Sequence, residues 1–223
     1  MQINPIAYIE NDFKEKFGIP RQSGLVNSLG KIVFLPEYSD PEALRGIEGF
    51  SHLWLIFDFS ACHTEKFSPT VRPPRLGGNK RIGVFASRSP FRPNSLGLSC
   101  VKLISIQDGK NGKELIVEGA DLLDKTPIYD IKPYLSFADC KTDAVSGYAD
   151  AVYGENIEVD FPGNLLSIIP KEKQQNLIDC LKQDPRPHYH EDSERVYSMR
   201  FADFDVHFKV KDNLLSVIKI DEA

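Results

Sequence analysis

Residues 52–59 read HLWLIFDF, an aromatic and aliphatic run without the 3.6-residue periodicity of an amphipathic helix. Similar short apolar runs, bounded by Gly, Pro or Asn, recur through the first 135 residues. They predict strands at residues 31–35, 52–59, 82–86, 99–106 and 115–117. The intervening PEALRGIEGF follows Asp40 and predicts a short capped helix or turn. Strands therefore outnumber helices in this part of the chain.

A body made of many short strands must protect its sheet edges from pairing with other chains. With few helices available to cover those edges, the simplest solution is to curl strongly or close into a barrel. We therefore predict a mainly β fold whose principal unit is a β-barrel.

The pattern changes after residue 135. An acidic stretch to Asp160 precedes residues 162–183, whose apolar spacing predicts an amphipathic helix interrupted at Pro170. The tail alternates apolar and polar residues on both sides of Lys211-Asp212-Asn213, which predicts a hairpin. We expect two domains: residues 1–145, the barrel, and residues 146–223, a smaller α+β domain.

Charge is distributed unevenly along the chain. Residues 66–107 contain eight Lys and Arg but no Asp or Glu, so the net charge of −5 is the balance between +8 here and −13 elsewhere. This segment suits an anionic or nucleic-acid partner. The prolines at 69, 73, 74, 90 and 93 exclude long helices there and favour ordered loops. A solvated basic surface with turn-shaping prolines explains the same composition.

Other features limit the class of protein. The first 20 residues lack a cationic start followed by an apolar run, and no stretch of 18 apolar residues occurs, so we expect a cytoplasmic protein without a membrane partner. The four cysteines, at 62, 100, 140 and 180, are about 40 residues apart and form no C-x-x-C pair. A zinc site at Cys62-His63 would need two more ligands. We therefore expect reduced thiols and no metal.

Five motifs occur in order: PRQ at 20–22, RPPRLGGN at 72–79, FRPN at 91–94 followed by Gly97, DIKPYL at 130–135 and DPRP at 184–187. In these motifs and in their order, the chain resembles the TrmO family, also called TsaA or YaeB-like proteins. The resemblance implies transfer of a methyl group from S-adenosylmethionine to N6 of threonylcarbamoyl-adenosine, next to the tRNA anticodon. It also implies a single-sheet β-barrel that binds the cofactor, a smaller C-terminal domain and a homodimer.

The resemblance also implies cofactor-binding residues. The PRQ motif maps to Pro20, Arg21 and Gln22. Further contacts map to Arg88, to Leu98, and to Asp121, Leu122, Leu123 and Asp124. For Arg21 a surface ion pair is the alternative, and Asp124 could simply cap a turn. Relatives often carry His-Gln after the aromatic strand, where this chain has Ser60-Ala61 followed by Cys62-His63, so contact at that position is doubtful.

The acceptor base carries a threonyl carboxylate that unmodified adenosine lacks, so an arginine pocket would select it. The candidates for this substrate-binding role are Arg72, Arg75, Arg92 and, from the DPRP segment, Arg186. A base that removes the N6 proton would help the reaction, and Asp121, Asp124 and Asp130 are candidates by residue type. No catalytic residue is assigned, because positioning of the two substrates can suffice.

Two other classes remain to be weighed. A non-catalytic RNA-binding β-barrel would explain the basic segment without a cofactor. A phosphate-ester hydrolase would need metal-binding carboxylates or a nucleophile beside a base, and the sequence presents no such group. A Rossmann methyltransferase would need a strand that ends in a Gly-rich turn opening a helix, which the sequence also lacks.

Overall fold

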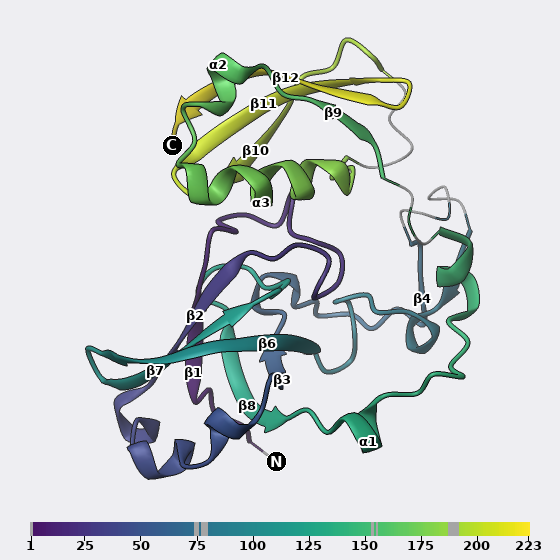
Figure 1. Cartoon of the computed structure of the whole chain (residues 1–223). Coiled ribbons are helices and arrows are strands. Elements are labelled where there is room, and N and C mark those ends of the chain that lie inside the picture. Colours follow the sequence, from purple (N-terminus) through teal and green to yellow (C-terminus); the bar gives the residue numbers. More distant parts are fainter. Residues whose placement is uncertain (1, 74–75, 77–79, 153, 155, 187–191) are drawn as a thin grey trace.

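The computed structural model describes residues 2–73, 76, 80–152, 154, 156–186 and 192–223. Six antiparallel strands form a ring-like sheet in which each strand pairs with two neighbours, in the order β1-β2-β7-β6-β3-β8 (Figure 1). The strands are β1 (Ala7–Glu10), β2 (Leu29–Phe34), β3 (His52–Asp58), β6 (Leu96–Gly109), β7 (Gly112–Glu118) and β8 (Pro127–Pro133). Pairing of Ala7 with Ile128 joins the last strand to the first.

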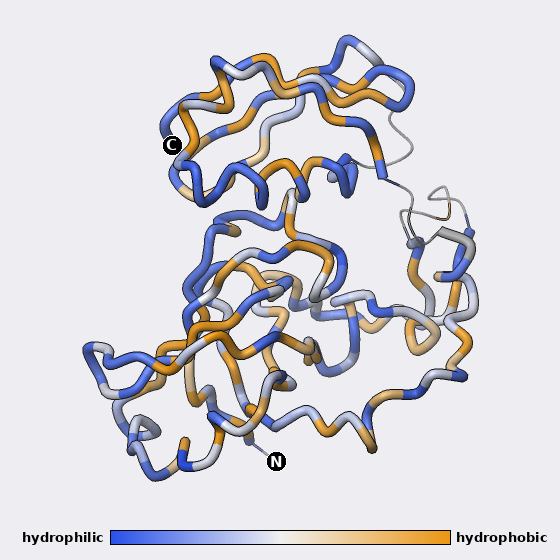
Figure 2. Tube along the Cα trace, viewed as in Figure 1, coloured by the Kyte–Doolittle hydropathy of each residue, from blue (hydrophilic) through white to orange (hydrophobic). Residues whose placement is uncertain are grey.

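Alternate residues of these strands point into the ring and form its core. Ile9, Ile32, Leu55, Leu115 and Ile128 are all fully buried. Their neighbours along the strands are polar or partly exposed, and Figure 2 shows this alternation as changes between orange and blue. The period of two is the pattern expected for strands with one buried face.

The connections between the strands are mostly 3-10 turns. Between β2 and β3 lie η1 (Pro36–Tyr38), η2 (Pro41–Leu44) and η3 (Ile47–Gly49), and the Asp40 side chain accepts from the Glu42 N–H, as the predicted cap requires. η4 (Ser60–Cys62) follows β3. The basic segment contains a hairpin of β4 (Thr70–Val71) and β5 (Ile82–Gly83), followed by η6 (Val84–Ala86). The strand predicted at 82–86 is therefore wrong after Gly83. There the chain turns to bury Val84, whose N–H donates to Pro69 O.

A smaller mixed sheet forms the C-terminal part. Its order is β10-β11-β12-β9, with β9 parallel to β12 and the other pairs antiparallel. It follows two short helical elements, α1 (Ser136–Asp139) and η7 (Gly147–Val152). The strands are β9 (Glu158–Asp160), β10 (Tyr197–Phe201), β11 (Phe204–Lys211) and β12 (Leu214–Glu222); the helices are α2 (Gly163–Leu166) and α3 (Lys171–Lys182). The predicted helix break at Pro170 and the hairpin turn at 211–213 are both confirmed.

The segment between β1 and β2 joins the two parts. Phe13 and Val26, 3% and 2% exposed, belong to the same core as Leu177 and Phe208 of the C-terminal part. The Asp12 carboxylate forms an ion pair with Lys173 of α3, and the Asp12 carbonyl accepts a hydrogen bond from the Ala202 N–H. In Figure 1, α3 lies between the mixed sheet and the ring, directly above this segment. The second core is therefore built partly from residues near the N-terminus.

Within the described ranges, no helix is long and apolar enough to cross a membrane. All four cysteines are free thiols.

Candidate functional site

Asp121 lies at the end of the ring, in the loop that leads from β7 to β8. Its carboxylate accepts a hydrogen bond from Ser99 Oγ on β6. Burial raises the pKa of Asp121, while the hydrogen bonds from Ser99 and from the backbone of Ser23, and the charge of Arg88, act in the opposite direction. An anionic group is thus held where it is poorly solvated, and a guanidinium lies close enough to affect it.

Arg88 connects this carboxylate to the PRQ motif. It lies in the loop between η6 and β6, and its Nη1 donates to Gln22 Oε1. The Gln22 side chain in turn donates from Nε2 to Arg21 O. Leu98, which follows Gly97 on β6 and precedes Ser99, is 59% exposed. Three segments far apart in sequence thus place Gln22, Arg88 and Asp121 together, and we call these three residues the Arg88 cluster.

Arg21 faces the C-terminal part. Its Nη2 donates to Asp184 O at 2.8 Å, across 163 residues of sequence. Asp184 is 7% exposed and has a positive φ of 47°. Both of its carboxylate oxygens accept hydrogen bonds from Arg186 Nε at 3.1 Å. Pro20 is buried. Arg21 and Arg186 therefore both bind Asp184 of the DPRP segment, whose last residue, Pro187, lies outside the described residues.

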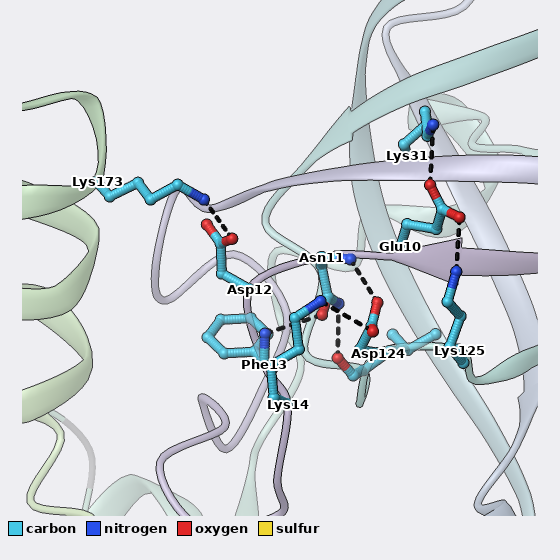
Figure 3. A network of polar contacts seen from close by, with 10 residues as sticks. Glu10, Asn11, Asp12, Phe13, Lys14, Lys31, Asp124, Lys125 and Lys173 are labelled. Atoms are coloured by element: carbon cyan, nitrogen blue, oxygen red, sulfur yellow. Dashed lines mark hydrogen bonds and ion pairs between the residues drawn. The ribbon is translucent and has the colours of Figure 1, made fainter. Parts of the chain in front are cut away.

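The other residues of the predicted Asp121–Asp124 contact have structural partners. Asp124 accepts from Asn11 N and from Lys14 Nζ, each at 2.9 Å (Figure 3). Leu122 is 1% exposed in the ring core, and its carbonyl accepts from Asn11 Nδ2. Leu123 O accepts from the Thr126 N–H and so closes the turn before β8. Asp124 borders a groove of about 700 Å³ between β1, β2 and α3, and Asp121 does not.

The predicted substrate arginines are placed differently from one another. Arg72 is exposed after β4, and Arg75 lies outside the described residues. Arg92 donates from Nη1 to Val84 O at 3.2 Å and to Ser87 O at 2.8 Å. Its guanidinium also lies 5.9 Å from the centroid of the Phe85 ring, whose residue is 75% exposed. Arg92 thus holds the turn that carries Arg88.

Asp58 and His63, which the sequence did not assign to the site, form a hydrogen-bonded pair. His63 Nε2 is 2.7 Å from Asp58 Oδ1 at the end of β3. The doubtful Ser60-Ala61 pair forms part of η4, and Ala61 O accepts from Lys16 Nζ. Asp130, a candidate base by type, accepts from the Ile131 N–H and pairs with Lys132. The five-residue spacing of an acid at a strand end and a histidine was the available signal for the missed pair.

Among the residues that the structure describes, no three His, Cys, Asp or Glu side chains are grouped as metal ligands. The polar site instead combines a partly buried carboxylate, an amide and a guanidinium at one end of a ring of strands. These features define a mainly β protein with a polar site of mixed charge that is unlike the glycine-rich turn of a Rossmann fold. Two family models match the chain: "tRNA-methyltransferase O N-terminal domain" over residues 8–140 and "TrmO C-terminal domain" over residues 155–223. The chain belongs to the TrmO family.

Individual relatives agree with this assignment. The chain is 41% identical to the "tRNA (adenine(37)-N6)-methyltransferase" of Escherichia coli K12, covering 99% of this chain and 97% of that protein. It is 45% identical to a protein of the same name from Eikenella corrodens, over 73% of this chain and 92% of that one. A crystal structure of TrmO from Pseudomonas aeruginosa superposes with a TM-score of 0.77 at 33% identity, covering 99% of this chain and 98% of the other.

Proposed function

We propose that this protein transfers a methyl group from S-adenosylmethionine to N6 of the adenine at position 37 of tRNA. The observation that carries the proposal is the match over nearly the whole chain to proteins named for that reaction. The finer part of the proposal is that the acceptor is threonylcarbamoyl-adenosine, as the motif resemblance implies. The proposal has three further parts. The protein acts in the cytoplasm as a homodimer, and the ring of strands is a closed barrel that binds the cofactor. The boundary between the two domains lies near residue 145.

The Arg88 cluster fits the cofactor chemically. The cofactor supplies a methyl group on a positively charged sulfur, together with a carboxylate, an ammonium group, a ribose and an adenine. Arg88 suits the carboxylate, and the partly buried carboxylate of Asp121 suits a positive group. Gln22 can both donate to and accept from ribose hydroxyls, and exposed Leu98 offers an apolar surface to the adenine.

The other predicted cofactor residues act through the backbone in this proposal. Pro20 and Arg21 fix the segment that presents Gln22, since one is buried and the other is tied to Asp184. Leu122, Leu123 and Asp124 fix the loop that presents Asp121. These contacts therefore position Gln22 and Asp121, two of the four residues that contact the cofactor in this proposal.

The acceptor side rests on the arginines and exposed aromatics. Arg72 and Arg75 are proposed to bind the threonyl carboxylate and the phosphates of the anticodon loop. Arg92 and Arg186, which already hold the protein's own carbonyl and carboxylate groups, contribute by fixing loops and by their charge. Phe85 and Phe91, 75% and 49% exposed, suit stacking with splayed single-stranded bases.

Nucleoside mass spectrometry tests the proposal. Purified protein, S-adenosylmethionine and tRNA carrying unmethylated threonylcarbamoyl-adenosine should yield the N6-methylated nucleoside. Arg88→Ala should weaken cofactor binding in calorimetry by about 10-fold or more, since it removes a charge-assisted hydrogen bond. Arg45→Ala is the matched control, because Arg45 is exposed and pairs with Glu42 outside the cluster.

The outcomes separate the classes of function. Binding of tRNA without any binding of S-adenosylmethionine would support the alternative, a non-catalytic RNA-binding protein. Cofactor binding with methylation of a different nucleoside would contradict only the acceptor. Equal cofactor affinity in the Arg88 and Arg45 variants would contradict the site.

A further inference from the structure

Asp58, at the end of β3, and His63 form a pair of a buried acid and an exposed histidine. Asp58 is 8% exposed, whereas the His63 side chain keeps 60% of its surface in solvent. The pair is joined through His63 Nε2 and Asp58 Oδ1 at 2.7 Å. Nδ1 of the same ring has no hydrogen-bond partner among the described residues. A carboxylate that holds one ring nitrogen leaves the other oriented for proton transfer.

The strand register places this pair close to the proposed cofactor contact. Asp58 lies directly opposite Leu96 in the β3–β6 pair, and Ile56 lies opposite Leu98. Leu96 and Leu98 share one face of β6, because residues two apart in a strand point the same way. Asp58 and Leu98 are thus diagonal neighbours, about 7–8 Å apart between backbones. An adenine that is brought to a cofactor bound at Leu98 is therefore within reach of His63, which is hydrogen-bonded to Asp58.

The carboxylates considered from the sequence are less suitable as bases. Asp124 and Asp130 are each held by a lysine and a backbone N–H. Asp121 receives hydrogen bonds from Ser99 and from the Ser23 backbone and faces the Arg88 charge. The oxygens of Asp124 and Asp130 are thus already occupied by lysine and N–H donors. Burial raises the pKa of Asp121, but its carboxylate is already assigned to the positive group of the cofactor in the proposed function. The imidazole of His63 presents an open nitrogen instead.

We propose that His63, oriented by Asp58, is the general base of the methyl transfer; this rests on the proposed function. The N6–H bond of the acceptor breaks and its proton passes to Nδ1 of His63. The N6 electron pair forms the new bond to the methyl carbon, while the carbon–sulfur bond breaks and its electrons stay on sulfur. The imidazolium formed is stabilised by the Asp58 carboxylate and returns its proton to solvent. General bases of this kind contribute about 10²–10⁴-fold to rate.

Charged and titratable groups lie around the pair on β8, on β1, in the segment after β1 and in the loop of His63, whereas β6 presents Leu96 and Leu98 to it. Tyr129 of β8 hydrogen-bonds to Asp58, and its pKa is raised by burial and then by the Asp58 charge. Tyr8 of β1 also faces Tyr129. Lys16, from the segment after β1, donates to Ala61 O two residues before His63. Cys62, Glu65 and Lys66 flank His63 in its own loop.

The test compares two Asp-His pairs of the same protein. His63→Ala should lower single-turnover methylation by about 100-fold or more, while the Kd for S-adenosylmethionine changes by less than about threefold. The remaining rate should lose the rise with pH that a histidine base gives, and added imidazole should restore part of it. His207→Ala is the matched control, because His207 pairs with Asp221 at 3.0 Å on the C-terminal sheet, and it should behave as the unmodified protein.

Asp58→Asn and a spectroscopic readout complete the test. The asparagine should lower the rate less than His63→Ala does, because the ring keeps a hydrogen-bond partner although the imidazolium loses its counter-charge. In protein with bound S-adenosylhomocysteine, hypomodified tRNA should shift the NMR ring signals of His63 and leave those of His207 unchanged. Full activity and an unchanged pH profile in folded His63→Ala protein would overturn the proposal. A native protein that methylates no tRNA would instead overturn the proposed function.

Discussion

Asp121 carries a cost for the folded protein at neutral pH. Its pKa is raised in the folded state, chiefly by burial, so the unfolded chain gives up this proton at lower pH than the native one does. The group therefore lowers the free energy of unfolding progressively as pH rises from the ordinary Asp value through the raised pKa. A residue retained at this cost fits a role in binding a positive group.

Asp121→Asn should consequently stabilise the protein while impairing cofactor binding. Asn Oδ1 can still accept from Ser99, but no charge is buried. We expect the Tm above pH 7 to rise by about 2–4 °C, the shift that about 1 kcal/mol gives in a protein of this size. The gain should shrink toward pH 4, where the native carboxyl also becomes neutral. Thermal unfolding across this pH range, with calorimetry of S-adenosylmethionine binding, measures both effects; a gain that grows as pH falls would contradict the assignment.

At the same scale, the sequence predicted residue identities better than it predicted their partners. Gln22, Arg88 and Asp121 were all named from motifs, and the structure brings them together. The contact of Arg21 with Asp184 joins residues 163 positions apart, so no local spacing could indicate it. The choice between a ligand contact and an internal hydrogen bond depends on tertiary packing, which motifs do not encode.

The pairing of β3 with β6 explains why a glycine follows the FRPN motif. Gly97 lies opposite Phe57, and a Cβ atom at Gly97 would lie 2.2 Å from the Phe57 ring. Phe57 is 2% exposed and packs edge-on against Phe59 at 5.0 Å, so its ring has little room to move. Gly97 therefore gives Phe57 its place in the ring core, next to Leu98.

Gly97→Ala should destabilise the protein by about 1–3 kcal/mol, as overpacking of a filled core does. Urea unfolding measures the loss. Gly83→Ala in β5 is the control, because no described atom lies within 4 Å of the position its Cβ would take. Phe57→Leu combined with Gly97→Ala should recover part of the loss, since it removes the ring that clashes. Equal stability of the two alanine variants would show that the ring adapts.

At the scale of elements, the long apolar runs were predicted and the short, proline-bounded ones were not. The strands β3, β6 and β7 were found by their composition, although β6 extends beyond its predicted ends. We missed β1, which has four residues, and β8, which begins and ends with proline. Both complete the ring through pairs with distant strands, so their extended form comes from tertiary hydrogen bonding.

For the molecule as a whole, the segment between β1 and β2 connects the proposed cofactor contacts to the C-terminal core. Phe13 and Val26 are buried in that core, and between them the same segment carries Arg21 and Gln22. Asp12 pairs with Lys173 of α3 at the segment's start (Figure 3). Ordering of this segment by the C-terminal core should therefore pre-organise Gln22 for Arg88 and for the cofactor.

Phe13→Ala tests this connection. Removing a buried phenylalanine should cost about 3–5 kcal/mol in the C-terminal core, so amides of β10–β12 should lose hydrogen-exchange protection more than those of β3 and β6 do. Phe137→Ala, at a side chain 85% exposed, is the matched control. Because the loosened segment carries Gln22, Phe13→Ala should also weaken S-adenosylmethionine binding. Thermodynamic linkage requires the converse effect, so bound cofactor should raise the hydrogen-exchange protection of β10–β12 in the native protein. Two results together would contradict this connection: Phe13→Ala leaves the cofactor affinity unchanged, and the cofactor leaves the protection of β10–β12 unchanged. The ring would then bind its ligand independently of the C-terminal part.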